Sequence, residues 1–251
     1  MNLQHFLYLY FWIAPHLLLP FVALAMFRRN LHREFPVFFS YLIFEFVQFC
    51  VLFVSYYSSW ISIATYQNID MFGRVGSIAL RFGIIREMFE APLNRSAPLR
   101  RAMARTLNIV SAVLVVLAIG FIGALYYGQS DNQFFPPYLI SQALNIAQCG
   151  LLGMVFLWHR FLALRMSPMT FGIAAGMGLV AGFEPLAHAL KNALPAQSAL
   201  VPDWLQMAIY HCAALFWLYC AMSREPITAS TRSDLPQLRG AADDMGRFIR
   251  L

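Results

Sequence analysis

Charged side chains are scarce in this sequence. They make up 12% of its 251 residues, whereas hydrophobic residues make up 60% and the mean hydropathy is +0.60. A soluble domain of this length has about twice that charged fraction, because polar groups must cover its apolar surface in water. The scarcity of charge therefore excludes an ordinary water-soluble domain and predicts a protein that is solvated by lipid.

Lysine and the common catalytic motifs are missing as well. Lys191 is the only lysine, so the last apolar stretch has no residue that could form a Schiff base with retinal. The four cysteines make no CxxC pair, and no GxSxG, P-loop, GxGxxG or HExxH motif occurs. These absences favour a protein that is not an enzyme, although they leave that class open, and they predict no cofactor.

Seven apolar stretches are each long enough to cross a hydrocarbon core, which takes about 20 helical residues. We expect them at His5–Phe27, Pro36–Tyr57, Asp70–Pro92, Leu107–Tyr127, Pro137–Trp158, Met169–Leu194 and Val201–Met222. The predicted fold is all-α, a polytopic bundle of seven transmembrane helices. It forms one domain over residues 1–222, followed by a tail at 223–251 that could end in a short amphipathic helix.

Arginine is distributed unevenly among the predicted connections. The connections after the first, third and fifth stretches and the tail carry arginine clusters, whereas Ser58–Ile69 and Gly128–Pro136 contain neither arginine nor lysine. Positive charge in short loops marks the cytoplasmic side of a membrane protein. The pattern predicts an N-terminus outside and a C-terminus in the cytoplasm, provided that the third stretch spans the membrane. Lys191 is the one exception.

The net charge of +6 follows from this orientation and from contact with anionic lipid. The arginines are spread over separate segments, so no nucleic-acid partner is predicted. The dominance of arginine over lysine indicates a GC-rich bacterial genome, and we expect a multi-pass protein of the bacterial inner membrane. The expected partners are the lipid bilayer, an unknown small molecule and, through the tail, a cytoplasmic protein.

Polar side chains recur at helical spacing inside the apolar stretches. Tyr41, Glu45 and Gln48 share one helix face, and a stripe of the same spacing ends in Asn145 and Gln148. Ionisable groups inside spans cost about 2.5–3.5 kcal/mol each on insertion scales, so they usually face the bundle interior. We predict a shared ligand cavity lined by Glu45, Gln48, Arg81, Asn145, Gln148 and Glu184.

Glu45 and Arg81 lie near mid-depth on consecutive antiparallel stretches, which predicts a buried ion pair between them. Such a pair would neutralise two groups that are costly to bury. It could act as a structural clamp or belong to an anion or proton site. Arg81 would favour an anionic group on a ligand.

The histidines offer a different site. Glu184 and His188 stand at i and i+4, and His211, with His16, could complete a zinc site that keeps an open position. His16 and His211 could instead ligate a haem, which needs two histidines at equal depth on neighbouring helices. The alternative to both is that these side chains are hydrogen-bonded residues of the bundle.

Glycines in the sixth stretch have small-xxx-small spacing, at Gly172 with Gly176 and at Gly178 with Gly182. This spacing permits a neighbouring helix to approach closely. We expect packing within the bundle in preference to dimerisation.

Two segments are similar to known sequences: Phe35-Pro36-Val37-Phe38-Phe39-Ser40-Tyr41 and Phe82-Gly83-Ile84-Ile85-Arg86-Glu87-Met88-Phe89. They resemble a group of seven-helix membrane proteins of soil bacteria that have no assigned activity. The resemblance covers the first three stretches, and it implies the architecture without a mechanism.

The leading hypothesis is a receptor-like or sensory membrane protein that binds a small ligand in the polar cavity. A small-solute transporter would use the same polar stripes to line a path. A metal-dependent intramembrane hydrolase would use Glu184, His188 and His211, and an accessory subunit of a membrane complex would use the tail.

Overall fold

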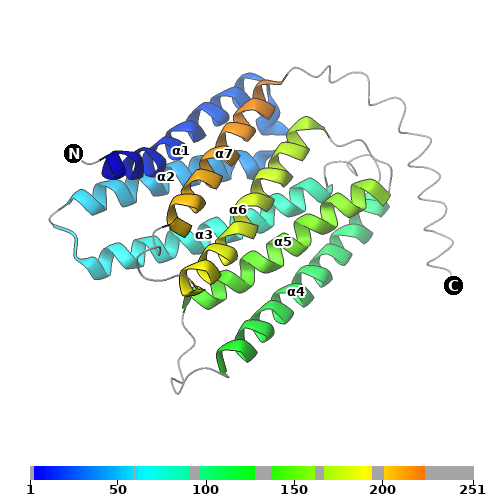
Figure 1. Cartoon of the computed structure of the whole chain (residues 1–251). Helices are drawn as coiled ribbons and strands as arrows, with labels where there is room; N and C mark the ends of the chain where they lie inside the picture. The colour runs from blue at the N-terminus through cyan, green and yellow to red at the C-terminus, as the bar shows by residue number, and fades with distance from the viewer. Residues whose placement is uncertain are drawn as a thin grey trace.

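A computed structural model of the chain describes residues 3–58, 60–90, 97–127, 137–161, 167–193 and 201–223. Within these ranges it contains no strand; it has seven α-helices and a short 3-10 turn, η1 (Leu31–Arg33). The helices are α1 (Leu3–Arg28), α2 (Pro36–Tyr57), α3 (Ile63–Glu90), α4 (Ala97–Tyr127), α5 (Pro137–Phe161), α6 (Pro168–Ala193) and α7 (Val201–Met222) (Figure 1). The predicted all-helical fold class is confirmed. The tail and its predicted amphipathic helix lie outside the described residues.

The residues at the start of α2 and α3 explain why the first boundary agrees with the prediction and the second differs from it. Pro36 opens α2 at the first helical position, where the missing N–H of proline costs nothing. α3 begins at Ile63 instead of Asp70, because Ser62 caps its first turn: the Ser62 hydroxyl accepts a hydrogen bond from the Thr65 N–H at 3.2 Å. The predicted loop is therefore shorter and the helix longer than expected.

Among the described residues, four helices contain stretches that are long and apolar enough to cross a membrane: Phe6–Arg28, Pro36–Tyr57, Pro168–Lys191 and Val201–Met222. Shorter apolar stretches lie in α4 (Arg105–Leu117) and α5 (Ser141–Leu157), within the residues that the structure describes. α3 is too polar to meet the same measure. Over the residues that the structure describes, the chain is thus all-helical with four candidate spans, consistent with a multi-pass membrane protein.

Six of the helices form a closed ring. Along the ring, α1 packs against α2, α2 against α3, α3 against α5, α5 against α6, α6 against α7, and α7 against α1. α4 lies outside this ring and packs against α3 and α5 (Figure 1). Side chains that point inward from the six ring helices therefore share one interior.

The two ends of the ring differ in composition. We call the end where α1 finishes and α2 begins the basic end; it holds Arg28, Arg29 and Arg33. We call the opposite end, where α2 finishes and α3 begins, the aromatic end; it holds Tyr56, Tyr57 and Trp60, all of them exposed.

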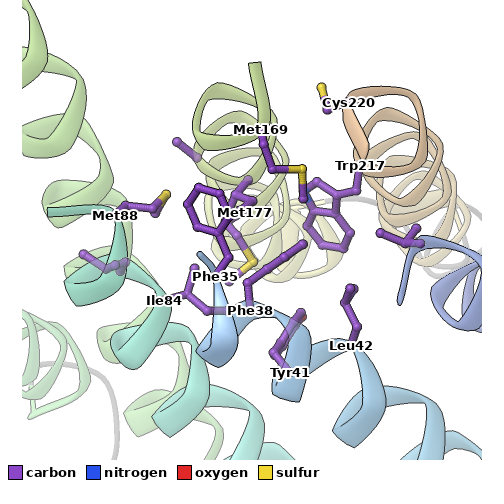
Figure 2. Packing of buried hydrophobic residues seen from close by; sticks show 14 of the residues in the cluster. Phe35, Phe38, Tyr41, Leu42, Ile84, Met88, Met169, Met177, Trp217 and Cys220 are labelled. Atoms are coloured by element: carbon purple, nitrogen blue, oxygen red, sulfur yellow. The ribbon is translucent and has the colours of Figure 1, made fainter. Parts of the chain in front are cut away.

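The hydrophobic core occupies the basic half of the ring. Phe38 of α2, Ile84 of α3 and Trp217 of α7 are completely buried there, together with Ile173 of α6. Figure 2 shows the labelled side chains of α2, α3, α6 and α7 converging on one another. Trp217 donates a hydrogen bond from Nε1 to the Gly172 carbonyl at 3.1 Å, so its one polar atom has a partner. The interior is thus filled with side chains at this end.

Contacts between distant segments also tie the basic end together. The Glu87 carboxylate of α3 accepts hydrogen bonds from the backbone N–H groups of Val37 and Phe38 at 2.8 and 3.0 Å. It therefore caps the first turn of α2, whose N–H groups have no partner within the helix. Arg29 donates to the Ala221 carbonyl at 2.8 Å and to the Ser223 carbonyl, at the C-terminal end of α7. Both contacts place opposite charge on a helix terminus.

The two glycine pairs of α6 face different neighbours. A Cβ atom at Gly172 would lie 2.6 Å from the Cys220 sulfur, and one at Gly176 would lie 2.7 Å from Cε2 of Trp217, so both glycines permit the close approach of α7. Gly178 and Gly182 face Leu152 and Cys149 of α5 at ordinary van der Waals distances. Both pairs pack within the bundle, as the sequence analysis expects.

Candidate functional site

A cluster of polar side chains lies next to the hydrophobic core, on its aromatic side. It is built from α2, α3, α5, α6 and α7, with Arg81 of α3 as its only arginine or lysine among the described residues. Its remaining polar groups come from the predicted stripes, from the buried Tyr41 and from the half-buried Tyr210. Tyr41 forms the boundary with the core, because its ring is completely buried and lies 6.4 Å from the ring of Trp217.

Arg81 turns toward α5 and α6. Its Nη1 atom lies 3.8 Å from Oε2 of Glu184 and 3.5 Å from Oδ1 of Asn145. The Arg81 and Glu184 side chains are only 13% and 16% exposed, so water screens this ion pair weakly. The structure therefore brings together three of the predicted site residues from three helices.

Glu45 binds Ser77 instead of forming the predicted ion pair with Arg81. The Ser77 hydroxyl donates a hydrogen bond to Oε1 of Glu45, which links α2 to α3. Ser77 precedes Arg81 by one helical turn, so it occupies the side of α3 that faces Glu45. Glu45 remains within electrostatic range of both Arg81 and Glu184. The predicted direct contact between Glu45 and Arg81 was therefore wrong: Arg81 pairs with Glu184 instead.

Gln148 and Gln48 complete the predicted set. Gln148 of α5 is 1% exposed, and its Nε2 atom donates to the Ile78 carbonyl of α3 at 3.2 Å. Gln48 of α2 packs directly on Gly73 of α3, where a Cβ atom would lie 2.9 Å from its Cγ. Gly73 thus lets the two helices approach at the aromatic side of the cluster. All six predicted cavity residues lie on helices of the closed ring.

Several buried polar atoms of the cluster have no hydrogen-bond partner. Within the described part of the chain they are Gln48 Oε1, Arg81 Nε, Asn145 Nδ2 and Gln148 Oε1. A buried polar group without a partner costs about 1–3 kcal/mol, and such groups are therefore rare in native proteins. Their concentration in one place makes this cluster the candidate site.

Tyr210 was missed by the sequence analysis. Its hydroxyl interacts electrostatically with Tyr41, Glu45 and Arg81, and its ring lies 6.5 Å from that of Trp217. A signal was present, because Tyr210 and Trp217 stand at i and i+7 and therefore share one face of α7. The sequence analysis selected the neighbouring His211 as a metal ligand instead. His211 lies on another face of α7.

The histidines do not gather around Glu184 in the described residues. His211 contacts the rings of Tyr10 and Phe11 at 5.6 and 6.0 Å, and His16 stacks on Phe49 at 4.4 Å. No group of three histidine, cysteine, aspartate or glutamate side chains in the described ranges is arranged to hold a metal ion. The side chain of His188 lies outside those ranges, so the four-residue metal set remains a prediction.

Comparisons with known protein families, with curated proteins and with solved structures found no match to this chain. The chemistry of the site is therefore the basis for a functional assignment.

Proposed function

We propose that this chain is a receptor-like membrane protein that binds a small polar ligand at the cluster around Arg81. The observation that carries the proposal is the set of buried polar atoms without partners, which line the interior of a closed helix ring. A ligand that supplies both donors and acceptors would satisfy Arg81 Nε and Asn145 Nδ2 on one side and Gln148 Oε1 on another. Binding would thus remove the energetic cost of burying these polar atoms without hydrogen-bond partners.

In this proposal all seven helices cross the membrane, although only four of them are apolar enough by themselves over their described residues. The two faces of α3 support its assignment as a span. On its exposed apolar face Phe72 and Val75 are 73% and 61% exposed, whereas Ser77 on its polar face is 5% exposed. Lipid would contact the apolar face, and the polar face would point into the ring. α3 is 28 residues long, which corresponds to about 42 Å at 1.5 Å per residue. That length exceeds the thickness of a hydrocarbon core.

We place the basic end in the cytoplasm and the aromatic end outside. Arginine at the basic end follows the rule for cytoplasmic loops, and tyrosine and tryptophan at the aromatic end suit a membrane interface. Lys191 is the exception to the charge pattern, and it forms an ion pair with Asp203 across α6 and α7. Because Asp203 neutralises it, this lysine does not weigh against the orientation.

The packed core favours a receptor over a transporter. A ligand at the Arg81 cluster is separated from the basic end by completely buried side chains such as Phe38, Ile84 and Trp217. Ligand binding would therefore reach the cytoplasm through helix movement that acts on the basic end. Uptake of a bound ligand into proteoliposomes would reassign the protein as a transporter.

Ligand binding to the full chain in nanodiscs tests the proposal. Native mass spectrometry would first identify any organic molecule retained after purification, and a thermal-shift screen of amines, carboxylates and neutral metabolites would add candidates. We expect Arg81→Ala and Asn145→Ala each to weaken binding at least about tenfold, the effect of losing one good polar contact. The matched control is Arg86→Ala, because Arg86 is an exposed arginine on the same helix that pairs with Glu90. If every ligand found binds both site variants as tightly as the wild type, the site is not the cluster.

A further inference from the structure

Three glutamates make contacts between helices of the ring in the part of the chain that the structure describes, and two of them meet groups that favour a carboxylate. Glu87 accepts hydrogen bonds from two backbone N–H groups at the start of α2, where the helix dipole also favours negative charge. Glu184 pairs with the Arg81 guanidinium at 3.8 Å. Each of these carboxylates therefore has a positively polarised partner that offsets the cost of burying its charge.

Glu45, the third of these glutamates, receives its contacts from neutral hydroxyl groups. The Ser77 hydroxyl donates a hydrogen bond to its Oε1 atom, and the Tyr41 phenol interacts with the same carboxyl group from one helical turn away. Tyr41 is completely buried and Ser77 is 5% exposed, so little water reaches this side of the carboxyl group. Neutral hydroxyls stabilise a buried carboxylate much less than a cation does, because they carry no charge. The surroundings of Glu45 therefore favour an uncharged carboxyl group.

The charges of the cluster balance only if one of its two carboxyl groups is neutral. Arg81 is the only arginine or lysine that the described residues place there, and its Nη1 atom contacts Glu184 and the Asn145 carbonyl oxygen. Glu45 and Glu184 also repel each other when both are ionised. An excess negative charge in a medium of low dielectric constant is expensive, and such a group takes up a proton instead. Of the two carboxyl groups, Glu45 is the one without an ion pair to the guanidinium.

The other groups that the described helices place around Glu45 supply no compensating cation. Tyr210 of α7 interacts with Glu45 through a neutral phenol, and α5 contributes neutral amides. α1 places His16 beside Tyr210, with 5.3 Å between the centres of the two rings. The Nδ1 atom of His16 is engaged within its own helix, because it donates a hydrogen bond to the Trp12 carbonyl at 2.9 Å. A proton on Glu45 itself is therefore the simplest source of charge balance.

We propose that Glu45 is a proton-binding site, whose carboxyl group holds a proton on Oε2 at neutral pH while Arg81 and Glu184 remain charged. A proton needs no cavity, so this inference goes beyond the proposed function and requires no organic ligand. The bound proton turns one oxygen of Glu45 from an acceptor into a donor and leaves the cluster without net charge. When the proton leaves to water at high pH, the contact between Glu45 and Ser77 holds a buried negative charge. Proton binding thus controls the charge at a contact between α2 and α3.

Infrared spectroscopy of the full chain tests this proposal, because a protonated carboxyl group has a C=O stretching band that a carboxylate lacks. The protein would be purified in dodecyl maltoside, which contains no carbonyl group, with isotopically labelled glutamate to separate its band from that of aspartate. We expect one protonated glutamate per chain at neutral pH, where an ordinary glutamate, with a pKa of about 4.3, is ionised. Absence of this band at neutral pH would overturn the proposal. Titration toward alkaline pH is expected to remove the band, and a band that persists until the protein unfolds would overturn reversible proton binding.

Glu45→Gln assigns the band to one residue, because it keeps the shape of the side chain and removes the carboxyl group. We expect this variant to lose the band at neutral pH. The matched control is Glu90→Gln, which removes a glutamate that pairs with Arg86 at the basic end, and we expect it to retain the band. A band that survives in Glu45→Gln would place the proton on another glutamate and overturn the proposal.

Ser77→Ala assigns the band with Glu45 left in place, and it decides the matter if Glu45→Gln does not give a monodisperse protein. The substitution removes the hydrogen bond to Oε1 of Glu45, and a C=O group with fewer hydrogen bonds absorbs at a higher wavenumber. We therefore expect the band to shift upward. The control is Ser40→Ala, because Ser40 is exposed on α2 and donates to the Pro36 carbonyl at 2.8 Å. A band that Ser77→Ala leaves unchanged would overturn the assignment to Glu45.

The outcomes for this inference and for the proposed function are distinguishable, because the band is measured without ligand. A protonated Glu45 in a chain that binds no ligand through Arg81 would uphold the inference and end the proposed function. Ligand binding by a chain that has no protonated glutamate would do the reverse.

Discussion

The two ends of the helix ring are held together in different ways. At the basic end, contacts between distant segments dominate: Glu87 of α3 caps α2, and Arg29 caps the end of α7. At the aromatic end, α3 starts with a local cap between Ser62 and Thr65. The core fills the basic half, and buried polar groups begin where it stops. One half therefore holds the packed core, and the other half holds the buried polar groups at which we propose binding.

The largest expected effect of a single substitution lies in the packed half. Trp217→Ala removes a completely buried ring and its hydrogen bond to Gly172, and we expect it to lower the free energy of unfolding by about 3–5 kcal/mol. Trp204→Ala is the matched control, because Trp204 lies at the aromatic end and is only partly buried. Thermal unfolding of both variants in detergent measures the difference. Equal losses would show that the two halves contribute alike.

A smaller effect distinguishes the two glycine pairs of α6. Gly176→Ala places a methyl group against the Trp217 indole, which has little room to move, and we expect a loss of about 1–3 kcal/mol. Gly178→Ala places the same group 4.0 Å from Leu152, and we expect a change within about 0.5 kcal/mol. The unfolding midpoints of the two variants provide the measurement. A larger loss at Gly178 would contradict the close packing of α6 on α7.

The smallest effect concerns the two kinds of helix cap. Glu87→Ala removes two hydrogen bonds from the start of α2, and we expect it to destabilise the protein by about 1–2 kcal/mol. Ser62→Ala removes one exposed local cap from α3, and we expect a loss of about 0.5 kcal/mol. Hydrogen exchange of the first turns of α2 and α3 would locate each loss. Protection that falls at the first turn of α3 instead of α2 in the Glu87 variant would contradict the role of that carboxylate as the cap of α2.

Much of the architecture could be read from local patterns. α2 and α7 begin and end where the apolar stretches predict, because proline and polar residues mark their ends. The stripe of Glu45 and Gln48 and the stripe of Asn145 and Gln148 both face the ring interior. Periodicity was sufficient here, since a polar group inside an apolar helix is too costly to leave in lipid.

Which polar side chains contact each other inside the ring could not be predicted from local patterns. Spacing places Glu45 and Arg81 at similar depths, but it does not determine how α3 is rotated between its neighbours. In the fold, Ser77 faces α2, and Arg81 reaches across to α5 and α6. The position of α4 outside the ring could not be predicted from the sequence either. Helices of similar length and hydropathy look alike in a sequence pattern, which does not show their neighbours in space.

Local spacing and composition thus settled the helical class, the polar stripes and the uneven distribution of arginine. Each of these follows from interactions within a few turns of one helix or between one segment and its solvent. The tertiary structure alone decided that Tyr210 and not His211 joins the cluster, and that the Arg81 guanidinium pairs with Glu184 and not with Glu45. Those outcomes depend on the rotation of each helix about its axis, which only the packing of the whole ring determines.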